Sequence, residues 1–445
     1  MNRIFKNAML FAAACSMTVS FTACSDSDDN NGVDPKVQDN EIEVLATQYY
    51  NSVIAPTYTN LANETETLYQ DILALKKKLN NGTTVSQSEI DAICTSYKNA
   101  RKYWEQSEAF LYGAASDFEI DPHIDTWPLD VNSLAKDLSS DAKIASLDGA
   151  EANGKARDYV SEENLGFHGL EFIFFRDGKN RDVAIFNNNA VENYTYKGDA
   201  YFSGMNVTGK EEVTFAAAIA CDLRDKCYQL EVAWLGSKAA ASHVARVAEC
   251  AKVYGEDFKT TVEKNGMSYG DNLLAIGKGS TIGTWKKVME TIFVSGCSNI
   301  CAEVADQKMG QAYRAAIGKP ETHIDEETGE EVADDPNYIE SPYSYNSYKD
   351  FKDNIMSIQN SLYGNIEGTS WTSTSVMSYL QKYNAAQAAE LDAKLKAALS
   401  ALDACLAYKN AFAQEPGAAC VKTAMDAIGE LDDCLNTTSK WVLTN

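Results

Sequence analysis

Apolar residues recur at helical spacing along most of the chain from residue 41 onwards. Leu68, Ile72, Leu75 and Leu79 are separated by four, three and four residues, and Gly82 follows them. Residues at this spacing share one face of a helix, and a glycine after the last of them is a common stop signal. The pattern therefore predicts an amphipathic helix that packs against a partner.

A second long helix is predicted directly after the first. Ser86 and Glu89 have the spacing of a capping box, and no proline interrupts the residues that follow up to Gly113. We expect this helix to run antiparallel to the first one.

The C-terminal half repeats the helical pattern. Leucines form one stripe through residues 389–412, and a second amphipathic segment spans residues 417–436 after Pro416 and Gly417. Further helical segments are predicted over residues 211–253 and 273–317. The sequence thus predicts an all-α protein made of two helical-bundle halves, the C-terminal one a four-helix bundle.

The stretch 176–210 lacks this periodicity and is rich in Asn and Gly. It predicts irregular structure with one small hairpin between the two halves. We therefore place a domain boundary at residue 205, with an N-terminal domain over residues 41–205 and a C-terminal bundle over residues 206–445.

The first 24 residues have the layout of a secretory signal. Basic residues are followed by an apolar stretch and by small residues that end at Cys24. The sequence "FTAC" resembles a bacterial lipobox, in which the cysteine becomes the lipidated first residue. We expect residues 1–24 to be a lipoprotein signal peptide and Cys24 to carry the lipid.

The acidic run "SDSDDNNGVD" follows Cys24, and we expect residues 25–40 to be a flexible tether. The run resembles the export signal of surface lipoproteins in Bacteroidota. An outer-membrane lipoprotein is therefore expected, exposed at the cell surface or facing the periplasm. The lipid would be its only contact with the membrane.

The net charge of -25 argues against nucleic acid as a partner, because phosphate backbones are bound by lysine and arginine. Nine carboxylates lie between Glu321 and Glu340, but they lack the alternating order of a calcium loop. We expect a solvated insertion there. The nine cysteines other than Cys15 and Cys24 are scattered without a CxxC, so buried free thiols are expected.

The candidate chemistry begins with His168 and Glu171. His168 is one of four histidines, and it lies three residues before Glu171 in an apolar run. Residues three apart share a helix face, so imidazole and carboxylate would project together and could bind a divalent metal such as zinc or iron. The alternative is a buried polar pair with a structural role.

Other segments add polar residues to this picture. Arg101, Trp104 and Glu108 have spacings that place them along one helix face, and Trp127 and Asp130 flank a proline turn. Each signal is weak alone.

These segments together resemble the imelysin-like proteins, also described as insulin-cleaving membrane proteases. The matching stretches are Trp104–Gly113, "WPLD" at 127–130, "GFHGLE" at 166–171 and "RDGK" at 176–179. The segment "SPYSYNSYKDFKDNI" also resembles a family motif, although Tyr345 and Ser347 differ from its usual residues. The resemblance implies two helical halves whose GxHxxE and serine–asparagine motifs meet near the interface.

Three functions are compatible with that site. The first is a metal- or ligand-binding lipoprotein with an interdomain cleft, where His168, Glu171, Glu108 and Asp130 would hold the metal. Ligand-binding residues would be Arg101, Trp104, Trp127, Ser344 and Asn346.

The second function is a metallopeptidase of the family, with His168 holding zinc and Glu171 acting as catalytic base. No second histidine lies on the same helix, so a further ligand would have to come from elsewhere. The third is a surface scaffold for a protein partner, in which the polar residues only fix the helix packing.

Overall fold

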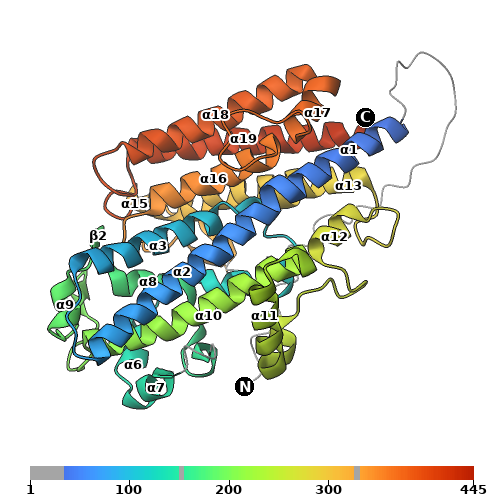
Figure 1. Ribbon diagram of the computed structural model, residues 1–445. Coiled ribbons are helices and arrows are strands. Elements are labelled where there is room, and N and C mark those ends of the chain that lie inside the picture. The colour runs from blue at the N-terminus through green and yellow to red at the C-terminus, as the bar shows by residue number, and fades with distance from the viewer. Residues whose placement is uncertain (1–34, 150–154, 325–330) are drawn as a thin grey trace, which may run out of the picture.

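The computed structural model describes residues 35–149, 155–324 and 331–445. Helices dominate these ranges, as Figure 1 shows, so the expected all-α class is confirmed. The strands form three short antiparallel pairs: β1 (Phe175–Arg176) with β2 (Lys179–Asn180), β3 (Thr195–Tyr196) with β4 (Asp199–Ala200), and β5 (Thr322–Ile324) with β6 (Glu331–Ala333). The first two pairs lie in the stretch where one hairpin was predicted. Cys24 lies outside the described residues.

The N-terminal helices follow the apolar stripes of the sequence. Helix α1 (Pro35–Tyr49) continues through a π-helical turn into α2 (Ala55–Asn80), so the last residues of the predicted tether are helical. Helix α3 (Gln87–Glu105) begins with the predicted capping box at Ser86 and packs antiparallel on α2. It ends eight residues before Gly113, and a separate 3-10 turn, η2 (Glu108–Phe110), follows.

Helix α10 (Gly209–Leu235) runs along α2 through the middle of the molecule (Figure 1). It also packs on α8 (Gly166–Phe174), so it contacts helices that precede the predicted boundary at residue 205. The expected single helix over 211–253 is broken at Gly236, whose φ of 57° suits glycine. Helix α11 (Ala241–Tyr254) follows as a separate element.

The segment predicted as one helix over residues 273–317 contains α12 (Tyr269–Leu274), a loop, and a long irregular helix. The long helix consists of α13 (Trp285–Glu290), η8 (Thr291–Ser298), α14 (Asn299–Ala302), η9 (Glu303–Lys308) and α15 (Gly310–Ala316). By length and composition Trp285–Ala316 could cross a membrane, but 56% of its most apolar window is buried inside the protein. Core helices have the same properties, so this is weak support for a span.

The C-terminal region contains α16 (Ser347–Tyr363), α17 (Val376–Tyr383), α18 (Ala385–Leu406) and α19 (Ala419–Thr444). Helices α18 and α19 lie side by side along one edge of the molecule (Figure 1). Helix α16 packs between α18 and α3, so it connects the C-terminal helices to the N-terminal ones.

Short helices connect the long ones. They are α4 (Ala114–Asp117), α5 (Ile120–Asp125), α6 (Val131–Leu138), α7 (Asp141–Leu147), α9 (Val183–Asn187) and the 3-10 turns η4 (Ala156–Asp158), η5 (Glu162–Asn164), η6 (Gly236–Lys238) and η7 (Gly255–Phe258). Helix α5 and the 3-10 turn η2 carry acidic residues of the site described below.

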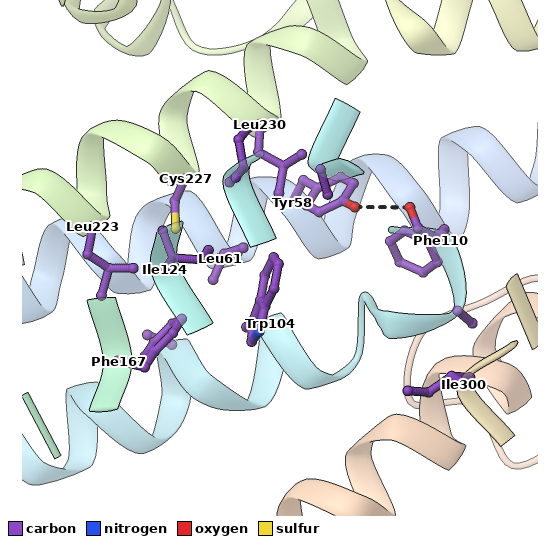
Figure 2. Close-up of a cluster of buried hydrophobic side chains, with 14 of the residues drawn as sticks. Tyr58, Leu61, Trp104, Phe110, Ile124, Phe167, Leu223, Cys227, Leu230 and Ile300 are labelled. Atoms are coloured by element: carbon purple, nitrogen blue, oxygen red, sulfur yellow. Dashed lines mark hydrogen bonds between the residues drawn. The ribbon is translucent and has the colours of Figure 1, made fainter. Parts of the chain in front are cut away.

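An apolar core fills the space between α2, α3 and α10. Figure 2 shows Trp104 pointing from α3 toward Leu61 and Tyr58 of α2, near Leu230 of α10. The Tyr58 hydroxyl donates to the carbonyl of Phe110 at 3.2 Å, which ties η2 to α2. All nine described cysteines are free thiols, and eight of them are buried.

Candidate metal centre

Four segments far apart in the sequence converge on one buried polar cluster. Helix α3 contributes Arg101 and Glu105, α5 contributes Asp125, and α8 contributes His168 and Glu171. The segment before α16 contributes a further buried residue, Glu340, which precedes the serine–asparagine motif. The cluster therefore lies where the GxHxxE helix meets the segment leading into α16.

Gly166 allows α8 to begin against α5. Its φ is +70°, and a Cβ added there would lie 2.0 Å from the carbonyl oxygen of Ile124. Only glycine combines this backbone conformation with so close an approach. As a result, His168 Nε2 lies 3.0 Å from Oδ1 of Asp125, the residue after Ile124.

Glu171 is held in place by the segment before α16. Its Oε1 accepts hydrogen bonds from Ser344 Oγ at 2.6 Å, from the Ser344 backbone N–H at 2.8 Å and from the Tyr343 backbone N–H at 3.1 Å. Its other oxygen, Oε2, lies 3.6 Å from His168 Nδ1. Glu171 thus orients the imidazole from the side opposite to Asp125.

Arg101 lies at the centre of three carboxylates and is fully buried. Its Nε is 2.5 Å from Glu105, and its two terminal nitrogens pair with Asp125 and Glu340. A guanidinium can serve three acceptors because its donors diverge in a fixed plane. Arg101 is therefore a cation shared by helix α3, helix α5 and the segment before α16.

The pKa values reflect burial and these charges. Burial alone would lower the pKa of His168, but the neighbouring carboxylates of Asp125 and Glu171 raise it to about 9. Burial alone would raise the pKa of Asp125, yet Arg101 and His168 hold it well below its usual range. Burial raises the pKa of Glu105 well above its ordinary value despite the contact with Arg101.

A second cation, Lys308 of η9, adjoins the cluster. Its Nζ is 3.4 Å from Glu340 Oε1 and 3.4 Å from Glu108 Oε1. Burial raises the pKa of Glu108 well above its ordinary value, although Lys308 partly offsets this. The cluster therefore holds more carboxylates than permanent cations.

Three residues of the cluster offer atoms that could hold one metal ion. Ligand atoms of Asp125, His168 and Glu340 lie within 4.8 Å of one another, and all three residues are buried. One imidazole nitrogen and two carboxylate oxygens suit zinc or iron. Chemically, the arrangement can bind a cation and hold it away from solvent.

The other expected site residues lie around this cluster at different distances. Trp104 donates from Nε1 to Asp125 Oδ2 at 2.6 Å, and Asn346 donates to Asp350 at 2.5 Å. Trp127 packs on Tyr338 with ring centroids 4.1 Å apart, and its ring is 5.9 Å from Lys308 Nζ.

Asp130 lies outside the cluster. It is exposed and caps α6, where it accepts hydrogen bonds from the backbone N–H groups of Asn132 and Ser133. A carboxylate at a helix N-terminus in this way has a structural role. It contributes no atom to the group formed by Asp125, His168 and Glu340.

Sequence reasoning missed Asp125, Glu340 and Lys308 as site residues. Asp125 is two residues before Trp127 of the "WPLD" stretch, a position that gave no separate signal. Glu340 ends the acidic run that was expected to be solvated, but it is fully buried. The signal that could have identified it is its place beside "SPYS", where the run becomes apolar and leads into α16.

Comparisons with known proteins identify the family and the fold of this chain. The family model of imelysin matches residues 54–435. Iron-regulated protein A of Synechococcus elongatus is 25% identical over 127 residues, which are 28% of this chain and 30% of that protein. A crystal structure assigned to an iron-regulated protein A precursor from Parabacteroides distasonis superposes with a TM-score of 0.68 at 21% identity and shows the same fold, covering 92% of this chain and 96% of that one. Because the family model spans most of the sequence, the chain belongs to the imelysin family.

Proposed function

We propose that this protein binds one divalent transition-metal ion through Asp125, His168 and Glu340. The observation that carries the proposal is the convergence of their ligand atoms within 4.8 Å at a buried position. Three ligands from α5, α8 and the segment before α16 would connect parts of the chain that are far apart in sequence. Metal binding would therefore stabilise the contact between them.

Unsatisfied oxygens support a cation at this place. Within the described residues, Oε2 of Glu340 and Oε2 of Glu171 are buried and accept no hydrogen bond. A buried carboxylate oxygen without a partner costs free energy, and a nearby cation would compensate for it. The raised pKa of Glu105 has the same cause, since burial and the neighbouring Glu340 carboxylate disfavour its charged form.

Glu171 has the position of a supporting residue in this proposal. A metal-binding histidine usually donates its other ring N–H to a carboxylate or carbonyl, which fixes the tautomer. Metal binding would displace the proton on Nε2. With Nδ1 facing Glu171, the neutral imidazole would then present Nε2 toward Asp125 and the metal. Ser344 holds Glu171 in turn, so the serine–asparagine segment would orient the GxHxxE helix.

The donor set favours iron or zinc as the metal. Imidazole suits both ions, and carboxylate oxygens favour hard over soft metal ions. The relatives named above are called iron-regulated protein A, which makes iron the first ion to test. Elemental analysis of protein purified without chelators is expected to find about one metal equivalent.

Thermal unfolding tests the binding residues. A ligand at one hundred times its Kd stabilises the folded state by about 2.7 kcal/mol, so ferrous iron or zinc should raise the Tm of the wild-type protein. His168→Ala should abolish the shift. The control is His243→Ala, because His243 is also buried and pairs with Glu231 at 2.5 Å outside the cluster. Equal shifts in wild type and His168→Ala would contradict the proposal.

Peptide hydrolysis is the second candidate, because the family description includes peptidases. The geometry favours binding over hydrolysis, since Glu171 is 0% exposed and its Oε1 already accepts three hydrogen bonds. A general base must reach the proton that it removes. A zymogram that compares wild type with Glu171→Ala is expected to show no difference, and cleavage by wild type alone would support the peptidase.

We also infer that the protein is an envelope lipoprotein anchored through Cys24. The signal-like segment and the cysteine in "FTAC" support this inference. Cys24→Ala should move the protein from the membrane fraction to the soluble fraction after cell lysis. Retention of the variant in the membrane fraction would argue for another anchor.

A further inference from the structure

Lys308 lies in an unusual environment for a lysine. Its ammonium nitrogen is 3.4 Å from Glu108 Oε1, 3.4 Å from Glu340 Oε1 and 3.5 Å from Glu303 Oε1. The side chain is only 2% exposed, whereas lysines usually keep the charged group in water.

The three distances are nearly equal and longer than those of a close ion pair. Hydrogen bonds between ammonium and carboxylate are typically about 2.7–2.9 Å long. Lys308 is therefore not paired with one partner but lies between three carboxylates. Three oxygens around a compact positive charge resemble the surroundings of a bound cation.

Glu340 joins this position to the proposed metal centre. Its Oε1 faces Lys308 and also pairs with Arg101, while its Oε2 is buried and accepts no hydrogen bond within the described residues. One carboxylate with two differently engaged oxygens can bridge two neighbouring cations. The positions of Lys308 and of the metal are adjacent for this reason.

We infer that the ammonium group of Lys308 occupies the position of a second divalent cation, bridged to the first by Glu340, and so limits the centre to one metal ion. The ligands of that second position would be the carboxylates of Glu108, Glu303 and Glu340. An all-carboxylate set suits a hard ion such as Mn²⁺. The inference rests on the proposed function, because it takes the neighbouring position for the first metal.

The proposed second position has a route to solvent. The side chain of Glu303 is 40% exposed, while those of Glu108 and Glu340 are buried. An ion could thus first meet Glu303 and then the two buried carboxylates. Replacing Lys308 by a smaller neutral residue would leave space for an ion between these carboxylates.

The experiment measures metal stoichiometry. Wild type, Lys308→Ser, Lys308→Gln and Lys308→Arg are loaded with Mn²⁺, desalted and analysed for metal per chain. We expect one equivalent in wild type and in Lys308→Arg, which keeps the positive charge, and two equivalents in Lys308→Ser and Lys308→Gln. Electron paramagnetic resonance should show coupling between two Mn²⁺ ions only in the two neutral variants.

A further variant identifies the ligands. Adding Glu108→Gln to Lys308→Ser should return the stoichiometry to one equivalent, because it removes one carboxylate of the second position. The neutral variants are less stable without metal, since they remove the ammonium group that lies between three carboxylates. They are therefore also refolded in excess Mn²⁺, and failure to recover folded protein there would count against the inference.

The outcomes separate this inference from the proposed function. No metal in wild type after loading with Mn²⁺, and in parallel with ferrous iron and with zinc, would refute the proposed function and this inference with it. One equivalent in wild type and in both neutral variants would refute only the role of Lys308. Two equivalents in wild type would also refute it, because the lysine would not then exclude the second ion.

Discussion

At the scale of single residues, Arg101 shows how charge organises the interior of this protein. One guanidinium serves Glu105 within its own helix, Asp125 at the end of α5 and Glu340 before α16. Burying such groups is costly, and the cost is offset only when each charge keeps its partners. Removing the shared cation would therefore affect three segments together.

Replacing Arg101 by methionine keeps most of the side-chain volume but leaves Glu105, Asp125 and Glu340 without their common partner. We expect a loss of about 3–5 kcal/mol in the free energy of unfolding, because breaking a buried ion pair from one side leaves uncompensated charge. Urea denaturation measures this loss of free energy. Lys396→Met, which breaks an exposed pair with Asp392, should cost less than about 1 kcal/mol. Similar losses in both variants would contradict this account.

Ser344 and Ser341 provide a matched pair for testing the support of the imidazole. Both are buried serines, but Ser344 donates to Glu171 at 2.6 Å while Ser341 donates to Asp350 at 2.5 Å. Ser344→Ala should weaken metal binding by about 10–100-fold, as expected when a partner behind a metal ligand is removed. Ser341→Ala should leave affinity nearly unchanged. Metal titration against a competing chelator distinguishes them, and equal affinities would argue against the supporting role of Ser344.

At the residue scale, the sequence indicated several residues of the site but not the partners that each of them would contact. His168, Glu171 and Arg101 were identified from their spacing, and Ser344 from the family resemblance. Asp125 and Glu340 were not, because neither has a local pattern that separates a buried carboxylate from a solvated one. Whether a carboxylate is buried depends on the cation that meets it, here Arg101, and that contact joins residues far apart in the chain.

At the scale of elements, the apolar stripes predicted where helices lie better than where they end. The stripe from Leu68 to Leu79 lies within α2, and the capping box at Ser86 begins α3 as expected. The early end of α3 at Glu105 was not predicted, because no proline or glycine marks it. The turn that follows presents Glu108 toward Lys308, so this irregularity belongs to the site.

Close packing of η8 on η2 gives an element-scale prediction. A Cβ at Gly296 would lie 2.1 Å from the carbonyl oxygen of Ala109, whereas a Cβ at Gly429 in α19 has no atom within 4 Å. Gly296→Ala must push η2 away and should destabilise the protein by roughly 1–3 kcal/mol, as overpacking does. Gly429→Ala should stabilise it by about 0.5–1 kcal/mol through helix propensity. Thermal unfolding compares them, and a harmless Gly296→Ala would refute the close contact.

At the scale of the whole molecule, the fold holds charged groups inside a helical body. Besides the candidate metal centre, the fold buries Arg181 between Glu192 and Glu212, at 2.9 and 2.6 Å. All three are buried, so this cluster is also shielded from solvent. The fold class could be predicted from helical periodicity, but these interior clusters could not, because each forms only when separate segments of the chain pack together.

The second cluster predicts how stability depends on pH. Burial, together with repulsion from Glu192, raises the pKa of Glu212 to about 7 despite the contact with Arg181. Because the folded-state pKa exceeds the unfolded value of 4.5, the folded state binds more protons between pH 4.5 and 7. This contribution to stability is fully present below pH 4.5 and is lost as pH rises through 7.

Glu212→Gln keeps a hydrogen-bonding group of similar size but cannot ionise. We expect the variant and wild type to have similar free energies of unfolding at pH 4.5. At pH 7.5 the variant should be more stable, by an amount on the order of 3 kcal/mol, because 1.36 kcal/mol corresponds to each unit of pKa difference. Urea denaturation at both pH values measures this, with the exposed Glu249→Gln as control. A variant that is less stable than wild type at pH 7.5 would show that Arg181 holds Glu212 in its charged form, and the pH dependence of folding would then have to arise at the other buried carboxylates.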